Sequence, residues 1–221
     1  MLERFLKKEG LVIAVGTLII YATTYFFERG YCSALNIPFD YIEISIPTIV
    51  NDFINFYALL LPLAFTSIAI MLRAEENSNK GWYALAPFLC GLVFSALLFY
   101  FVEKTIQSAL LCLFMGGLYF VLITFKSGFK EDDTTLRAFY STSLLIGMAA
   151  LLFSFTCIAI GKSMAENGTF QIYIKNDKKY ILLKVYGENA FMREINKGKP
   201  NSDVVYFNTK DMTGMTIKAD D

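Results

Sequence analysis

The side chains that usually carry out chemistry are few in this chain, and their spacing predicts no catalytic centre. Histidine is absent from the 221 residues, which removes the commonest general base and the commonest metal ligand. The four cysteines form neither a CxxC pair nor the spacing of a zinc site. Three of them fall in apolar stretches, and Cys32 lies in a predicted loop. We therefore expect no enzyme activity, no metal site and no cofactor.

Charge and composition instead predict a membrane protein with a soluble extension. The chain carries 20 basic and 20 acidic residues, so no charge bias predicts direct binding of nucleic acid. Hydrophobic residues make up 55% of the chain, against roughly 45–50% in soluble domains. The excess lies within residues 10–161. We expect a transmembrane helical domain over residues 1–162 and a soluble β-rich domain over residues 163–221.

Five uncharged stretches in the first part are about as long as a membrane-spanning helix, which needs roughly 20 apolar residues. They cover residues 10–27, 53–72, 81–102, 105–125 and 138–161. Glu103 and Lys104 separate the third from the fourth. Burying such charges in lipid costs about 2.5–3.5 kcal/mol each, so a tight helical hairpin is predicted. The expected fold is an α-helical multi-spanning membrane protein with four to five transmembrane helices and a small C-terminal all-β domain.

The distribution of basic residues predicts the orientation of the chain in the lipid bilayer. One set of connections holds Arg4, Lys7, Lys8, Arg73, Lys80, Lys126, Lys130 and Arg137, and the opposite loops hold Arg29 and Lys104. The positive-inside rule then places the N-terminus in the cytoplasm and the C-terminal domain in the periplasm. If residues 81–125 form a re-entrant hairpin, or if the first stretch lies in the interface, the tail is cytoplasmic. Four spans and five spans are therefore both possible at this point.

The last sixty residues change from helical blocks to the alternation typical of strands. Phe170, Ile172 and Ile174 alternate with polar residues, and turn chemistry follows at residues 176–177 and 187–189. About five short strands are expected, packed as a small barrel or meander. A domain of this size buries too little surface to be comfortably stable alone, so we expect it to lean on the membrane domain or on a neighbouring subunit.

The connection over residues 29–52 is too apolar for a simple solvated loop, yet Asp40 and Glu43 exclude a path through lipid. Its aromatic and aliphatic side chains are typical of the headgroup level of a bilayer. We hypothesise an interfacial sensing loop, and the alternative is a cap packed over the helical bundle. The residues concerned are Tyr31, Phe39, Tyr41, Ile42 and Ile44.

The connection over residues 126–137 mixes charges of both signs and faces the cytoplasm in the predicted topology. It is either a solvated turn or a docking site for a soluble partner. The residues concerned are Lys126, Lys130, Glu131, Asp132, Asp133 and Arg137.

Polar residues inside the apolar stretches favour a passive role. No Asp, Glu, Lys or Arg lies away from the ends of those stretches, which argues against ion-coupled transport. Serine and threonine residues within them either bond between helices or line an oligomeric pore; Ser141, Ser143, Ser154 and Thr156 are the candidates. Small residues on the later stretches favour close helix packing and a homo-oligomer.

Two segments carry a resemblance to a known family. The segment GYCSALNIPFDYIEISIPTIV follows the first apolar stretch, and KKYILLKVYGENAFMREIN lies in the β-rich tail. With the order of spans and tail, they resemble the membrane subunits (KwaA) of bacterial Kiwa anti-phage systems. The resemblance implies an oligomeric sensor of envelope perturbation in the bacterial inner membrane, with four spans. It also implies a soluble, DNA-binding KwaB-like partner that carries the chemistry.

Two functions are therefore expected of this chain. The first is a non-enzymatic membrane sensor and scaffold in antiviral defence, which signals to a soluble partner. The alternative is an oligomeric pore or channel subunit.

Overall fold

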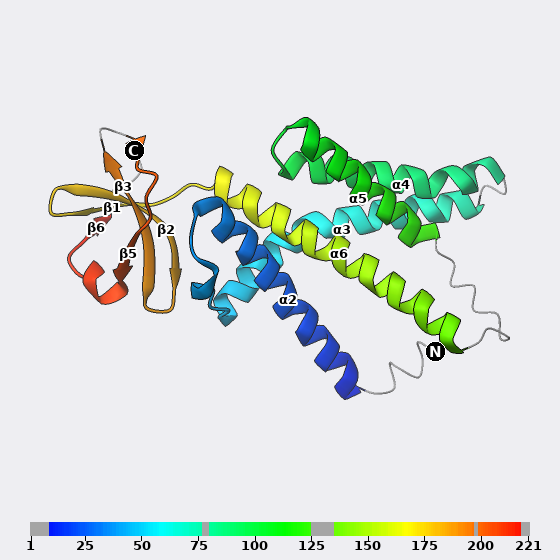
Figure 1. Cartoon of the computed structure of the whole chain (residues 1–221), viewed down its shortest axis with the longest axis horizontal. Coiled ribbons are helices and arrows are strands. Elements are labelled where there is room, and N and C mark those ends of the chain that lie inside the picture. Colours follow the sequence, from blue (N-terminus) through cyan, green and yellow to red (C-terminus); the bar gives the residue numbers. More distant parts are fainter. Residues whose placement is uncertain (1–8, 77–79, 125–134, 197–198, 218–221) are drawn as a thin grey trace.

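The structure, a computed structural model, describes residues 9–76, 80–124, 135–196 and 199–217. Within these ranges, five α-helices precede an antiparallel β-sheet. Figure 1 shows the sheet at one end of the molecule, with the helices extending away from it. The helices are α2 (Glu9–Leu35), α3 (Ile46–Glu76), α4 (Lys80–Phe101), α5 (Ile106–Thr124) and α6 (Thr135–Asn167). The prediction of a helical part followed by a β-rich part is confirmed.

Helix α2 continues well past the apolar stretch that predicts it and ends at Leu35. Asn36 has φ 58°, and the backbone N–H of Ile37 donates to the carbonyl of Cys32 at 3.0 Å. These are the marks of a Schellman end, in which a left-handed residue reverses the chain and satisfies a late carbonyl. The prediction that Cys32 lies in a loop is therefore wrong, because it is buried on the last turns of α2.

The predicted connection over residues 29–52 is likewise too long. Its first seven residues belong to α2 and its last seven belong to α3, which begins at Ile46. The Ser45 hydroxyl accepts from the backbone N–H of Thr48 at 3.3 Å, which is how serine caps a helix N-terminus. Pro47 is therefore in the first turn of α3, where proline is favourable because its missing N–H would have no partner within the helix. A short 3₁₀ turn, η1 (Phe39–Tyr41), lies between the two helices.

Helices α4 and α5 form the predicted hairpin around Glu103 and Lys104. The Thr105 hydroxyl accepts from the backbone N–H of Ser108 at 3.1 Å and so begins α5. On the outside of this turn, the Glu103 carboxylate accepts from Lys162 of α6 at 2.7 Å. Glu103, one of the two charges that predict the hairpin, thus ties it to α6.

Two helical segments among the described residues are long and apolar enough to cross a membrane, Ile106–Thr124 and Ser143–Asn167. A shorter apolar stretch, Leu85–Phe101, lies in α4. Two is fewer than the four to five spans that the sequence predicts. Large apolar side chains such as Leu110 and Phe114 nonetheless point outward. Apolar side chains exposed over whole helices are typical of lipid-facing or subunit-facing surfaces.

Helices α2 and α6 cross in close contact near the sheet. A Cβ atom added at Gly30 would overlap the carbonyl oxygen of Ile158, and one added at Gly161 would overlap that of Phe27. Small residues let helix backbones approach in this way. Phe27, Cys157 and Ile160 pack together beside the crossing, with Phe56 of α3.

The sheet is antiparallel throughout, with the order β4-β3-β2-β1-β6 and with β5 paired to β3. Its strands are β1 (Ile172–Lys175), β2 (Lys178–Tyr186), β3 (Asn189–Asn196), β4 (Lys199–Pro200), β5 (Val205–Asn208) and β6 (Thr216–Ile217). Asn176 and Asp177 both have positive φ, as two-residue hairpin turns require. The sequence predicts about five strands; the additional strand, β4, has only two residues and pairs with the end of β3.

The sheet buries side chains on both faces. Leu183, Tyr186 and Phe191 pack against Cys32, Leu35 and Ile37 at the end of α2. Tyr180, Ala190 and Met192 form a second cluster on the other face, covered by Phe207 and the residues that follow it. The first cluster joins the helical part to the sheet.

Candidate functional site

The sheet packs against the last two turns of α2. Besides the apolar cluster, polar side chains cross this junction. The Tyr31 hydroxyl donates to the carbonyl of Leu183 at 3.2 Å. The guanidinium of Arg193, from β3, donates to the carbonyl of Leu35 at 2.8 Å. A basic group at a helix C-terminus is favourable, because the last carbonyls lack partners within the helix. We call the polar side chains at this contact the junction cluster, and define it as Glu28, Tyr31, Cys32, Asp52, Lys184 and Tyr186.

Glu28 is the centre of the junction cluster and is completely buried. Its carboxylate accepts from the ammonium of Lys184 at 2.5 Å and from the hydroxyl of Tyr186. The Lys184 ammonium also lies 4.6 Å from the ring centroid of Tyr31, a favourable cation–π distance. An ionised carboxylate is tolerated inside a protein only when it is paired and hydrogen-bonded in this way.

Lys184 reaches Glu28 because β2 contains a β-bulge. The pairing of β2 with β3 shifts register between Leu182 and Lys184. Leu183 packs in the cluster at the end of α2, and Lys184, the next residue, points to the same face to bind Glu28. Strict alternation would send neighbouring side chains to opposite faces, whereas a bulge re-aims a side chain. The irregularity therefore places the ammonium in the junction.

Asp52 brings a second carboxylate to the same place, from the start of α3. It is completely buried. Asn51 donates to Oδ1 at the long distance of 3.5 Å, and Oδ2 receives no hydrogen bond from the part of the chain that the structure describes. Burial raises the pKa of Asp52 from 3.8 to about 8, and the negative charge of Glu28 adds to this. Asp52 is thus protonated at neutral pH, while Glu28 binds the lysine.

The other members of the junction cluster stay neutral and act as donors. Burial raises the pKa of Tyr186 far above its ordinary value and the pKa of Tyr31 to about 12, and in both cases the charge of Glu28 adds to the effect. Burial also raises the pKa of Cys32. Since Tyr186 gives its proton to Glu28, the Cys32 thiol, 3.0 Å away, donates to the Tyr186 oxygen. A buried, protonated thiol is a poor nucleophile, so the arrangement holds charge and protons and does not suit covalent catalysis.

Sequence reasoning missed Glu28, Asp52, Lys184 and Tyr186. One signal was present: Glu28 directly follows the first uncharged stretch, and Asp52 directly precedes the second. Consecutive helices that reverse direction bring those two ends to one side of the bundle. The position of Lys184 could not be predicted from the sequence. Regular strand alternation places its side chain on the face of the sheet that points away from Glu28.

The proposed sensing loop lies against the sheet, with three half-buried members and two exposed ones, Phe39 and Tyr41. The ring of Tyr41 packs on its edge against Phe191, with 5.1 Å between centroids, and Ile42 packs against the cluster at the end of α2. Tyr31 belongs to the junction cluster. Phe39 is exposed under the guanidinium of Arg29, and Ile44 is half-buried. Tyr41 also lines an open cleft of about 470 Å³ beside Tyr206 and Asp203.

The proposed docking residues Lys126, Lys130, Glu131, Asp132 and Asp133 lie outside the described residues. Arg137 belongs to the first turn of α6. Docking at this connection therefore stays a prediction.

Two of the candidate pore-lining residues, Ser154 and Thr156, bond within their own helix. The Thr156 hydroxyl is buried and donates to the carbonyl of Leu152, and the Ser154 hydroxyl donates to that of Ala150. Ser143 is exposed, and the side chain of Ser141 lies outside the described part.

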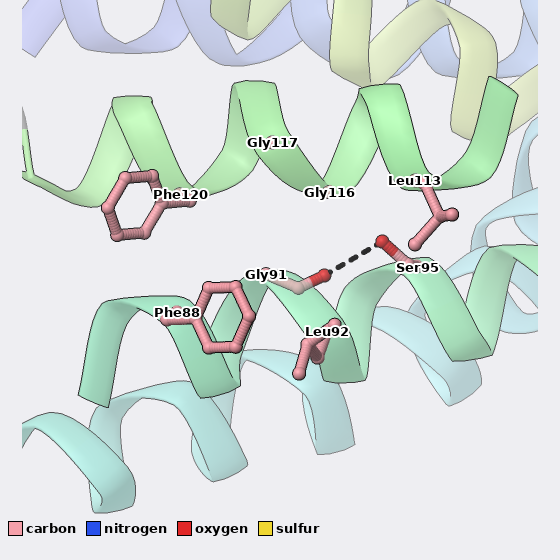
Figure 2. Close-up of a pocket in the computed structure, with 8 residues that line it drawn as sticks. All are labelled: Phe88, Gly91, Leu92, Ser95, Leu113, Gly116, Gly117 and Phe120. Atoms are coloured by element: carbon pink, nitrogen blue, oxygen red, sulfur yellow. Dashed lines mark hydrogen bonds between the residues drawn. The ribbon is translucent and has the colours of Figure 1, made fainter. Parts of the chain in front are cut away.

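An apolar cavity of about 290 Å³ lies between α4 and α5 (Figure 2). Gly91 and Gly116 form its floor, where a Cβ on either glycine would meet the carbonyl oxygen of the other. The Ser95 hydroxyl donates to the carbonyl of Gly91 at 3.0 Å, as the dashed line in Figure 2 marks. Phe88 and Phe120 stand at one end of the cavity. The residues that line the cavity are apolar or small and include no charged side chain. Such a lining fits a packed helix or an acyl chain.

No group of three metal-ligating side chains is brought together within residues 9–76, 80–124, 135–196 and 199–217. Comparisons of the chain with models of protein families, with curated proteins and with solved structures find no match.

Proposed function

We propose that this chain is a non-enzymatic membrane sensor and scaffold, in which the helical bundle responds to perturbation of the envelope and the signal passes to a soluble partner. The observation that carries this proposal is the continuity of α2. One uninterrupted helix runs from the first apolar stretch into the junction cluster (Figure 1). A displacement of α2 in the bilayer therefore reaches the sheet without an intervening flexible loop.

The close crossing of α2 and α6 couples a displacement of α2 to α6 as well, and α6 runs to the end of the bundle that lies away from the sheet. Gly30 and Gly161 hold the two helices backbone to backbone. Helix α6 has 33 residues, so it is about 50 Å long at 1.5 Å per residue. The β-rich domain follows one end of α6, and residues 126–137 reach its other end. This arrangement supports a topology with the domain in the periplasm and the charged connection in the cytoplasm.

The resemblance to Kiwa membrane subunits indicates which kind of stimulus the chain would sense and which kind of partner it would bind. In this proposal the chain is a multi-pass protein of the bacterial inner membrane, the stimulus is phage infection, and a KwaB-like protein docks on residues 126–137. The charges of that connection suit a soluble protein surface.

A homo-oligomer is part of the proposal. The N-terminal half of α2 is exposed within one chain, with Ile13, Leu18 and Ile19 pointing outward. Lipid or a second copy must cover these side chains, because water does not stabilise so much apolar surface.

The test is affinity purification of the tagged full-length chain from its native membrane in mild detergent, with mass spectrometry of the retained proteins. We expect a soluble partner in a fixed ratio to the chain. The variant Lys184→Met, which breaks the junction, should lose the response of the partner to infection when it is compared with the unmodified chain at matched amounts in the membrane. Lys162→Met, which removes an exposed ion pair, is the matched control.

The outcome that contradicts the proposal is recovery of the chain alone as a defined oligomer. Ion flux through liposomes that contain the purified chain would then favour the pore subunit.

A further inference from the structure

The junction cluster has two carboxyl groups and one ammonium group. Glu28 and Asp52 are both completely buried, and Lys184 is the one ammonium among the described residues that is bonded to either carboxylate. Two adjacent buried carboxylates with a single cation cannot both be ionised without a large cost. A proton bound to the unpartnered Oδ2 of Asp52 would balance the second carboxylate.

We propose that Glu28 and Asp52 form a proton-binding site, which keeps the β-rich domain clamped to α2 while the proton is bound and loosens the clamp when it leaves. The inference rests on the proposed sensor function and deepens it, because it names the ligand of the sensor as the proton. The site requires both helices: Glu28 comes from α2, and Asp52 comes from α3.

Among the residues that the structure describes, no other group takes the place of this proton. Tyr31 and Cys32 from α2, and Tyr186 from β2, are neutral donors whose hydrogens already have acceptors. Other charged or titratable groups of the packed elements are engaged elsewhere: Arg29 over Phe39, Glu43 beside Gly187, Arg193 on the carbonyl of Leu35, Cys157 in the apolar cluster at the helix crossing, and Lys162 with Glu103 and Glu166.

The bound and free states differ by one proton and one charge. When Asp52 is protonated, it is neutral, and the ions left in the cluster are the Glu28 carboxylate and the Lys184 ammonium. When the proton leaves to water, the O–H bond breaks, its electron pair stays on Asp52, and the two buried carboxylates share one ammonium, so the cluster carries a net negative charge. Repulsion between the carboxylates then pushes the start of α3 from α2, and the ionised Asp52 competes with Glu28 for the Lys184 ammonium that holds the sheet to α2.

Two features make this exchange accessible near neutral pH. Burial, then the charge of Glu28, place the pKa of Asp52 at about 8, although the Lys184 charge works in the opposite direction. The side chain of Lys184 is 19% exposed, so the cluster borders water on the side of β2. A proton can reach Asp52 without crossing the apolar part of the bundle.

The first experiment is an infrared titration of the purified full-length chain in detergent, which follows the C=O stretch of protonated carboxyl groups. We expect one buried carboxyl to lose its proton with a midpoint near pH 8. The Asp52→Asn variant should lack this band. The Asp203→Asn variant, which alters an exposed carboxylate, should keep it. The Glu28→Gln variant should shift the midpoint to lower pH, because Asp52 then pairs with Lys184 alone.

The second experiment measures the clamp itself. Spin labels on Gln107→Cys and Lys199→Cys, both at exposed positions, report the distance between the bundle and the sheet. The four native cysteines are buried, so the labels react at the introduced ones. We expect the distance distribution to broaden on the alkaline side of the midpoint in the otherwise unmodified chain and to stay constant in Asp52→Asn.

The outcomes separate this inference from the proposed function. If no carboxyl of the unmodified chain titrates between about pH 6 and about pH 9, the proton site is wrong, and the sensor and scaffold role stands on its own test. If the carboxyl titrates but the distances do not change, the clamp is wrong. If both respond but the purified chain retains no partner, the proton site holds and the scaffold fails.

Discussion

Gly30 of α2 and Gly161 of α6 lie on one helix crossing, and each faces the backbone of the other helix. The carbonyl oxygens of Ile158 and Phe27 occupy the space that a Cβ would need. Two helices that touch backbone to backbone move together. This pair therefore links the helix that carries the sheet to the helix that leads into it.

Gly30→Ala and Gly161→Ala should each separate the helices. Overpacking of a filled site costs typically about 1–3 kcal/mol, so we expect a clear fall in the unfolding temperature in detergent. Gly16→Ala on α2 and Gly147→Ala on α6 are matched controls, because nothing lies within 4 Å of a Cβ at either position. The readout is a thiol-reactive dye, since all four cysteines of the chain are free and buried. Equal effects at all four glycines would contradict the crossing.

The α4–α5 hairpin allows the same comparison of a close-packed glycine with an open one, at the adjacent residues Gly116 and Gly117. Gly116→Ala should destabilise the protein, because the new Cβ would collide with Ser95 and with the carbonyl of Gly91. Gly117→Ala meets nothing within 4 Å and should be neutral or slightly stabilising, since alanine favours helix by about 0.8–1.0 kcal/mol over glycine. The dye assay again gives the unfolding temperature. A loss of stability in Gly117→Ala as large as that in Gly116→Ala would show that the cavity floor is not as close-packed as described.

Lys184→Met should destabilise the protein far more than Lys162→Met. Removing one partner of a buried ion pair costs about 3–5 kcal/mol, because the other charge remains buried and unpaired. Lys162 binds Glu103 at the surface, and such pairs contribute little. Loss of helical circular dichroism on heating measures both variants. Similar unfolding temperatures for the two would mean that Glu28 finds another partner.

Much of the fold could be predicted from the sequence, because hydrophobic blocks and strand alternation are local signals. The helix positions, the hairpin turn at Glu103 and Lys104 and the β-turn at Asn176 and Asp177 all follow from such signals. The end of α2 did not, because a charged residue such as Glu28 reads as a helix boundary when lipid is the only environment considered. A second domain accepts that charge, and the helix continues.

The junction cluster shows the limit of sequence reasoning more clearly. Its two carboxylates come from helices that are adjacent in the chain, and that part of the site was within reach. Lys184 was not, because its direction depends on the bulge between Leu182 and Lys184. A shift of one residue in register reverses the face of every side chain that follows, and nothing in the composition of β2 marks it.

Tyr41→Ala should loosen the connection after α2 from the sheet. Its ring contacts Phe191 and lies 6.0 Å from that of Tyr206, and aromatic pairs add about 0.5–1.5 kcal/mol beyond their buried area. Phe39→Ala, two residues earlier in the same turn and similarly exposed, is the control, because its ring packs with the guanidinium of Arg29 on α2. We expect a lower unfolding temperature for Tyr41→Ala alone. If Phe39→Ala lowers it equally, the connection is stabilised by its own turn and not by the sheet.

The stability of the protein should fall as pH rises through the neutral range. The pKa of Asp52 is raised in the folded chain from 3.8 to about 8, so folding binds a proton between these values. The stabilisation is complete below 3.8 and is lost as pH rises through about 8. The slope is at most about 1.4 kcal/mol per pH unit. Circular dichroism melts at several pH values give this slope, and Asp52→Asn, which keeps a neutral side chain at every pH, should flatten it. A slope that persists unchanged in Asp52→Asn would assign the titration to another group.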